Sequence, residues 1–289
     1  MKQELNIWVV GGDLRQGKLA ELLAEDGHTV HTYGLEELPE GSRFAAPDLH
    51  RIARADCVVL PLPAMGEEGC LNTPLSRRPL PLGEVLDLLH PDQTLCAGRV
   101  TPELTREAER RGLTLRDYFA REELAVANAV PTAEGAIQIA MEELPITLYG
   151  ARVLVIGFGR VGKLTAHRLA GLGARVTVSA RTYRDLAWIE AYGYGAERTD
   201  QLEGWLCGYD LVINTVPARI LTRSLLEDLT PGCLVIDLAS KPGGVDFEAA
   251  ADLGVKAVWA LSLPGKVAPV SSGRILRDTI YHMLQELGG

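Results

Sequence analysis

A glycine-rich segment in the middle of the chain constrains the fold more than any other feature. The apolar residues 153–156 are typical of a β-strand, and Gly157, Phe158, Gly159, Arg160, Val161 and Gly162 follow them directly. In this G-x-G-x-x-G spacing the glycines allow a tight turn and a close approach of phosphates. Residues 162–172 continue as a helix whose first backbone amides can hold a pyrophosphate. The segment predicts a dinucleotide-binding Rossmann domain; the alternative is a turn of the same fold that binds nothing.

The end of the next strand indicates which dinucleotide binds. Residues 175–179 form this expected strand, and an NAD site usually carries Asp or Glu about 20 residues beyond the glycines to bind the ribose 2′-hydroxyl. This chain has Arg181 there, with Ser179, Thr182 and Arg184 close by. Because an arginine with hydroxyl neighbours suits a 2′-phosphate, the pattern favours NADP(H) over NAD(H). The alternative is a solvated surface arginine.

Length, charge and cysteine content restrict the class of protein. The chain has 289 residues, 47% of them hydrophobic and 23% charged, which is typical of a globular protein of two domains. A net charge of −9 argues against a nucleic-acid-binding surface. The apolar residues 7–10 are too short for a signal peptide or a membrane span, so we expect a cytoplasmic protein. The five cysteines are scattered and show no metal-site spacing, so we expect reduced thiols and no metal.

The N-terminal half repeats the strand–helix pattern, with strands expected at 6–10, 29–33, 56–60 and 94–97 and helices at 15–25, 82–89 and 101–111. Residues 11–17 resemble a second nucleotide fingerprint, but Asp13 stands where a pyrophosphate needs amides and no negative charge. We therefore assign residues 1–130 to substrate binding and catalysis. Asp13 itself has two interpretations, a group of the active site or a helix N-cap.

Pro131 marks the expected domain boundary. The helical segment 121–144 is interrupted at 128–131, because a proline disfavours helix at the residue before it. A new helix then begins at Pro131, with Thr132 and Glu134 in its first turn. The cofactor domain spans 131–271, and the amphipathic helix 272–289 returns to complete the first domain. The predicted fold class is α/β, with two Rossmann-like doubly wound parallel-sheet domains and an interdomain cleft.

Three loops of the cofactor domain follow strands expected at 210–214, 234–237 and 256–261. Ligands of such sheets bind at the carboxyl ends of the strands. The first loop therefore adds Thr215, Val216 and Pro217 to the cofactor site. The second and third loops carry charged residues, namely Lys241, Asp246 and Lys266.

Five segments together resemble the family of the dipicolinate synthase A subunit. The most specific are Asn-Ala-Val-Pro-Thr-Ala-Glu-Gly at 128–135 and Pro-Gly-Lys-Val-Ala-Pro at 264–269. Gly-Gly-Asp at 11–13 with Arg15, the glycine fingerprint and residues 236–246 complete the match, which spans nearly the whole chain. The resemblance implies oxidation of dihydrodipicolinate, or of its hydroxytetrahydro precursor, to dipicolinate with NADP as hydride acceptor. It also implies that the partner is the dipicolinate synthase B subunit, and it implies a place in the mother cell of a sporulating bacterium.

The small dicarboxylate substrate implied by this resemblance decides which residues are candidates for catalysis. Two carboxylates require cations, which Arg15, Lys241 and Lys266 supply, and loss of a ring proton requires a modest base such as a carboxylate. The expected catalytic set is Asp13, Arg15, Thr132, Glu134, Lys241, Asp246 and Lys266. The alternatives are helix-terminal roles for the acids and solvation for the lysines.

Two other functions stay open. One is an NADP-dependent dehydrogenase of another small carboxylated substrate, and the other is a non-catalytic nucleotide-sensing subunit. A homo-oligomer is expected in either case.

Overall fold

The chain divides into two compact units. Unit 1 comprises Met1–Asn128 with Ala268–Gly289, and unit 2 comprises Ala129–Val267. The structure is a computed structural model that describes residues 4–39 and 43–288, so residues 1–3 and 289, the ends of the expected domains, lie outside the described residues. Each unit is built on one sheet of parallel strands. The prediction of two α/β parallel-sheet domains is confirmed.

Unit 1 has a five-stranded sheet in the order β2-β1-β3-β4-β5. The strands are β1 Asn6–Val10, β2 Thr29–Tyr33, β3 Cys57–Val59, β4 Thr94–Ala97 and β5 Leu115–Asp117. The helices are α1 Leu14–Glu25, α2 Leu82–Leu86, α3 Pro102–Arg110 and α10 Pro269–Gly288, with single 3₁₀ turns at η1 Leu49–Arg54 and η2 Tyr118–Ala120. Thr101 caps α3 and Pro102 opens it, as the sequence predicts.

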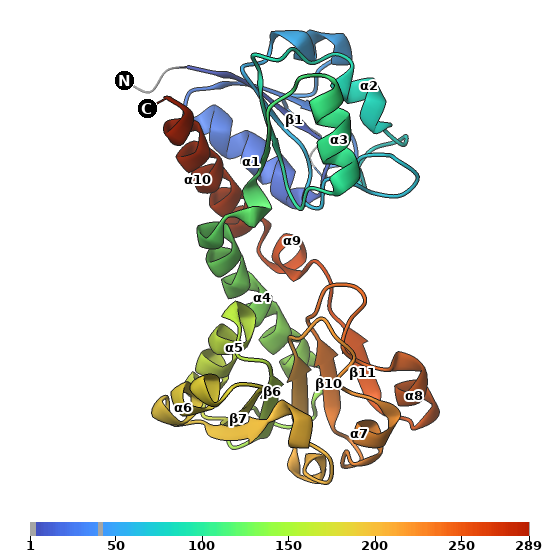
Figure 1. Cartoon of the computed structure of the whole chain (residues 1–289), viewed down its shortest axis with the longest axis vertical. Helices are drawn as coiled ribbons and strands as arrows, with labels where there is room; N and C mark the ends of the chain where they lie inside the picture. The colour runs from blue at the N-terminus through green and yellow to red at the C-terminus, as the bar shows by residue number, and fades with distance from the viewer. Residues whose placement is uncertain (1–3, 40–42, 289) are drawn as a thin grey trace. The chain divides into compact units, whose positions relative to one another are not determined.

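Helices cover both faces of the unit 1 sheet (Figure 1). On one face α1 and α10 pack side by side, and Leu19, Leu276 and Ile280 share a buried cluster with Ile7 of β1. On the other face α2 and α3 supply a second cluster. The last helix is therefore part of the core of unit 1, since its apolar stripe has no exposure at Ile280.

Unit 2 has a six-stranded sheet in the order β11-β10-β9-β6-β7-β8, which reverses direction between β6 and β9. The strands are β6 Arg152–Ile156, β7 Arg175–Ala180, β8 Gly195–Arg198, β9 Leu211–Asn214, β10 Leu234–Asp237 and β11 Lys256–Trp259. The helices are α5 Arg160–Gly171, α6 Tyr183–Ala191, α7 Arg223–Glu227, α8 Phe247–Asp252 and α9 Leu263–Val267, and the 3₁₀ turns are η3 Thr199–Gln201 and η4 Leu206–Gly208. This order is that of the dinucleotide-binding Rossmann fold, whose ligands bind at the reversal.

The expected interruption of the helix at Pro131 is wrong. A single helix, α4, runs over Glu122–Glu143 with Pro131 inside it. Proline removes only one backbone hydrogen bond there, whereas the flanking residues Leu124, Ala129, Ala133 and Ala136 are buried and hold both halves in place. Thr132 and Glu134 therefore lie within a helix and do not begin one.

A second local prediction also fails. Residues 264–269 are expected as a loop, but 264–267 belong to the short helix α9 Leu263–Val267, whose Leu263 packs into the core of unit 2. Burial of this leucine stabilises a short turn of helix. The prolines at 264 and 269 make the segment look like a loop in the sequence.

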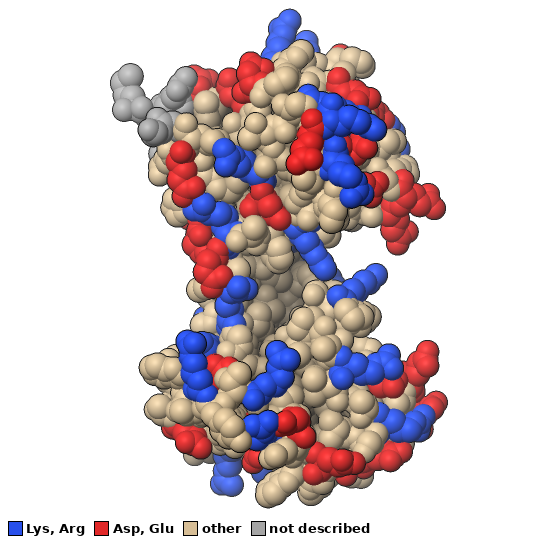
Figure 2. Space-filling model, in the orientation of Figure 1, with Lys and Arg blue, Asp and Glu red and all other residues tan. Residues whose placement is uncertain are grey.

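The cysteines and the surface agree with the prediction of a globular protein with reduced thiols. All five cysteines are free thiols, and burial raises the pKa of Cys233 to about 12, which keeps it protonated and unreactive. Of the helices in the described ranges, none is long and apolar enough to cross a membrane. On the face of each unit that Figure 2 shows, basic and acidic side chains are interspersed.

The contact between α1 and α10 makes a testable contribution to stability. Ile280→Ala removes a side chain without solvent exposure, so we expect the free energy of unfolding to fall by about 2–5 kcal/mol. Gln285→Ala changes an exposed position of the same helix and should cost less than about 0.5 kcal/mol. Urea denaturation of both variants measures the difference; equal stabilities would contradict the role of α10 in this core.

Candidate dinucleotide-binding site

The turn after β6 brings a helix into close contact with a strand end. The Gly157 amide donates a hydrogen bond of 2.9 Å to the Ser179 carbonyl of β7, and its φ of +99° lies in the region that favours glycine. A Cβ at Gly162 would stand 2.0 Å from the Gly157 carbonyl oxygen. The first and third glycines of the fingerprint are therefore required by packing within the protein.

The middle glycine has a different environment. Gly159 is the N-cap of α5, no side chain caps this helix, and a Cβ added at Gly159 would meet no atom within 4 Å. The first amides of a helix have no acceptor within the helix, so this end offers donors next to open space. That arrangement fits a pyrophosphate, the group that a dinucleotide presents.

A cavity of about 390 Å³ extends from this turn along the carboxyl ends of the strands. Its lining comes from four loops of unit 2, and consists of Gly157, Phe158, Gly159, Ala180, Arg181, Thr182, Asp185, Thr199, Thr215, Val216, Pro217, Ala218 and Ile220. Arg160, Val161, Gly162, Ser179 and Arg184, also expected in the cofactor site, are outside this lining. The cavity spans the point where the strand order reverses, between β6 and β9.

The far end of the cavity carries one arginine and one carboxylate. Arg181 is exposed directly after β7. Thr182 caps α6, where its hydroxyl donates to Asp185 at 2.8 Å and accepts the Asp185 amide at 3.1 Å. Ser179 is fully buried and its hydroxyl oxygen accepts from Thr199 at 3.1 Å. The exposed Arg181 and Thr182 and the half-buried Asp185 are thus the polar groups at this end, and the sequence analysis missed Asp185.

A buried carboxylate joins the loops that follow β9 and β10. Asp237 has no solvent exposure; its Oδ1 accepts from Asn214 Nδ2 at 2.7 Å and from the Ala239 amide at 3.0 Å. Its Oδ2 accepts from the Gly244 amide at 2.7 Å. Three donors offset the desolvation of this charge.

Asn214 extends the same network to the cavity. Its Nδ2 also donates to the Val216 carbonyl at 3.0 Å, and its Oδ1 accepts the Val216 amide at 3.2 Å. Asn214 and Asp237 therefore position both loops, and sequence reasoning assigned neither a role. The signal was present, since each is the polar last residue of an otherwise apolar strand.

Comparison with known proteins identifies both halves of the chain. Residues 6–119 match the model of the N-terminal domain of the dipicolinate synthase A subunit. Residues 124–239 match the NAD-binding domain of D-isomer-specific 2-hydroxyacid dehydrogenases. The chain is 35% identical to the dipicolinate synthase A subunit of Bacillus subtilis over 98% of its own length and 97% of the relative's. The chain belongs to the family of the dipicolinate synthase A subunit.

Solved structures of this family have the same fold. The crystal structure of the dipicolinate synthase A chain from Bacillus subtilis has a TM-score of 0.87 at 34% identity and covers 100% of this chain and 98% of its own. The structure of the A subunit from Bacillus halodurans has a TM-score of 0.87 at 32% identity, with 97% of both chains covered. Together with the dehydrogenase domain match, the family supports an oxidoreductase that uses a nicotinamide cofactor.

The residues expected to bind substrate in unit 1 are paired with each other. Asp13 is the N-cap of α1 and accepts the Arg15 amide at 3.0 Å. Arg15 is buried, and its guanidinium donates to both Asp13 oxygens and to the Leu62 carbonyl, the last at 2.6 Å. The N-cap interpretation of Asp13 therefore describes its local role.

The charged catalytic residues expected in unit 2 lie on three segments: the loop between β10 and α8, helix α9, and helix α4. Lys241, in the loop after β10, and Lys266, in α9, are exposed, and neither forms an ion pair within the described ranges. Asp246 caps α8, with Arg219 at 3.4 Å. Glu134 of α4 lies 3.4 Å from Arg168 of α5. The structure thus gives both lysines free ammonium groups and gives both acids arginine partners.

Because Gly159 faces open space while Gly157 and Gly162 are packed against the protein, a substitution at Gly159 can test cofactor binding with little effect on folding. Gly159→Ala should lower NADP⁺ affinity at least about tenfold, because its methyl group enters the space where a pyrophosphate approaches. The melting temperature should fall only slightly, since no protein atom lies near that methyl group and only the N-cap preference for glycine over alanine is lost. Gly171→Ala near the end of α5 also has open space and serves as the control with normal affinity. Calorimetric titration measures the affinity and thermal melts measure the stability. Unaltered NADP⁺ binding by Gly159→Ala would show that the pyrophosphate does not bind at this turn.

Proposed function

We propose that this chain is the dehydrogenase subunit of a dipicolinate synthase in a sporulating cell, where it uses NADP⁺ and works with a second subunit. The observation that carries the proposal is an intact dinucleotide turn within a chain that matches the dipicolinate synthase A subunit of Bacillus subtilis from end to end. The substrate is dihydrodipicolinate or its hydroxytetrahydro precursor, and the product is the aromatic dicarboxylate.

The proposed oxidation removes two hydrogens from the ring. A nicotinamide cofactor held in the cavity at the Gly157–Gly159 turn would supply the acceptor for one of them, which leaves as a hydride with its electron pair. The other leaves a neighbouring ring atom as a proton, and a carboxylate of the protein accepts it. The hydroxytetrahydro precursor also loses water. Since aromaticity stabilises the product, the protein has to hold the ring in position more than it has to activate it.

Three cations are proposed to bind the substrate carboxylates. Lys241 and Lys266 are suited to this role because both ammonium groups are exposed and unpaired within the described ranges. Arg15 would share its guanidinium with Asp13, which keeps its planar donors oriented. Glu134 is the proposed base, with Asp246 and Asp13 as the other candidates and Thr132 close to Glu134 in sequence.

The preference for NADP⁺ rests on Arg181. Arg181→Ala should weaken NADP⁺ binding by about ten- to a hundredfold through loss of a charge-assisted contact of about 1.5–3 kcal/mol, and should leave NAD⁺ binding unchanged. Asp185→Asn removes the carboxylate at the same end of the cavity and should leave NADP⁺ affinity equal or higher, because a carboxylate repels a 2′-phosphate. Calorimetry with both cofactors measures this. The proposal would be contradicted if the normal chain bound NAD⁺ more tightly than NADP⁺ and Asp185→Asn weakened NAD⁺ binding. That result would show that Asp185 binds the ribose and that the site prefers NAD⁺.

The reaction is tested with fresh product of dihydrodipicolinate synthase and NADP⁺, for the chain alone and with the B subunit, by following NADPH and dipicolinate together. Equal amounts of both products support the proposal. NADP⁺ binding without either product, in the presence of the B subunit, would indicate a nucleotide-sensing role. Formation of NADPH only with other small carboxylated substrates would assign another dehydrogenase activity.

The same assay tests the substrate residues. Lys241→Ala should lower turnover at least about tenfold at limiting substrate while NADP⁺ affinity stays near normal, because the loss concerns substrate positioning. Lys266→Ala and Glu134→Gln should behave alike. Lys256→Ala, which removes an ammonium paired with Glu143 away from the cavity, should have normal turnover. Normal turnover in Lys241→Ala, Lys266→Ala and Glu134→Gln would place the substrate site elsewhere.

A further inference from the structure

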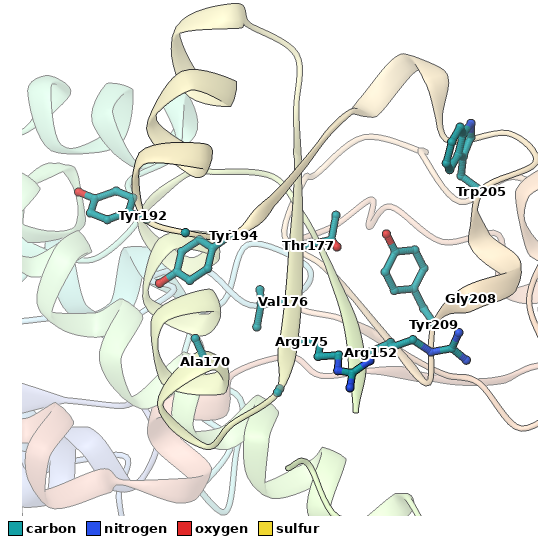
Figure 3. A pocket seen from close by; sticks show the side chains of 12 residues that line it. Arg152, Ala170, Arg175, Val176, Thr177, Tyr192, Tyr194, Trp205, Gly208 and Tyr209 are labelled. Atoms are coloured by element: carbon teal, nitrogen blue, oxygen red, sulfur yellow. The ribbon is translucent and has the colours of Figure 1, made fainter. Parts of the chain in front are cut away.

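A second hollow of unit 2 lies at the amino ends of the strands, away from the glycine turn. It has a volume of about 650 Å³ and runs past the starts of β6 and β7 (Figure 3). Helices α5 and α6 connect β6 to β7 and β7 to β8, but the connection from β8 to β9 contains only the turns η3 and η4. The sheet is therefore covered by full helices on one face only at this edge. We call the hollow the β6–β7 groove.

Two arginines at this edge form a local positive charge. Arg152 and Arg175 are register partners on adjacent parallel strands. Since Val153 and Val176 point into the core beneath α4, α5 and α6, both arginines point to the opposite face. Side chains in this relation start about 5 Å apart, and like charges so placed repel each other. Figure 3 shows both guanidinium groups at the same end of the groove.

The protein neutralises little of this charge. Arg152 has one carboxylate near it, Asp210, at 3.8 Å, and Arg175 has no ion pair with any residue that the structure describes. The groove lining contains no Asp or Glu. A chain with a net charge of −9 thus keeps two adjacent, nearly unpaired guanidiniums in a hollow, an arrangement that carboxylates from outside would stabilise.

Aromatic rings also line the groove. Trp205 is 64% exposed and Tyr192 is 58% exposed, and Tyr209 stands between Trp205 and the arginines in Figure 3. Exposed Trp, Tyr and Arg together are the residues that contribute most binding energy at protein interfaces. The open rings also argue against a small-molecule site, because such sites bury most of the ligand.

We propose that the β6–β7 groove docks an acidic segment of the partner subunit, with its carboxylates on Arg152 and Arg175 and an apolar side chain against Trp205. A second copy of this chain is a poorer occupant. A two-fold interface centred here would bring four guanidiniums together with no carboxylate in the lining. The identity of this partner, the dipicolinate synthase B subunit, rests on the proposed function.

The test is the affinity of the purified chain for the B subunit from the same organism, measured by biolayer interferometry. Arg175→Glu and Trp205→Ala should each raise Kd at least about tenfold, and Arg175→Lys should retain most of the affinity. Arg106→Glu makes the same charge change at an exposed position of α3 and should change Kd less than about twofold. Affinity of the normal chain should fall with added salt, and that dependence should weaken in Arg175→Glu.

Three results would overturn the proposal. The first is that the normal chain does not bind the B subunit, or that Kd is normal in both Arg175→Glu and Trp205→Ala. The second is self-association of the chain alone that Trp205→Ala abolishes in sedimentation, which would make the groove an interface between copies. The third is saturable binding of free dipicolinate that Trp205→Ala abolishes, which would make the groove a small-molecule site. NADP⁺ affinity, measured in parallel, should be normal in every variant, so a failure of the cofactor site is recognised separately.

Discussion

The close contact between α5 and the end of β6 is the constraint on which the cofactor site depends. A side chain at Gly162 would overlap the Gly157 carbonyl, so only glycine lets the helix begin this near the strand. The first amides of α5 then lie where the strand order reverses, between β6 and β9. In the proposed cofactor site, phosphate recognition would follow from this backbone placement, next to the open space at Gly159. Selectivity between cofactors would then depend on side chains farther along the cavity, Arg181 and Asp185.

A second constraint, the buried charge of Asp237, orders the other side of the same edge. Its three hydrogen bonds tie the loop after β9 to the loop after β10. One of these loops supplies Val216 to the cavity, and the other carries Lys241. Loss of one of the three donors would leave this buried charge less well compensated, so the two loops are held together. In the proposed dehydrogenase this coupling would help to hold substrate and cofactor in one geometry for hydride transfer.

The sequence predicts the fold correctly where a segment's own residues show that it is buried or capped. Apolar strands such as 153–156 and 211–213, the fingerprint and the capped helix α3 are all placed correctly. β8 was missed because Gly195–Arg198 has no apolar alternation and exists through its pairing with β7. The helix through Pro131 was missed because packing on both sides outweighs one lost hydrogen bond. The pairing of Asp13 with Arg15 could not be predicted either, since the buried Leu62 carbonyl that completes it is distant in sequence.

The two ends of β7 carry two separate concentrations of positive charge. Arg175 begins the strand in the β6–β7 groove, and Arg181 follows its last residue at the cofactor cavity. Six residues of strand separate the two sites by about 20 Å, which is more than two Debye lengths at physiological salt. Their charges therefore act independently across solvent, although one rigid strand joins them. A partner bound at the amino end would influence the cofactor only through a shift of β7 itself, because its buried residues Val176 and Val178 fix the strand in the core of unit 2. If both proposals hold, assembly and cofactor choice in this chain depend on different ends of the same strand and can vary separately.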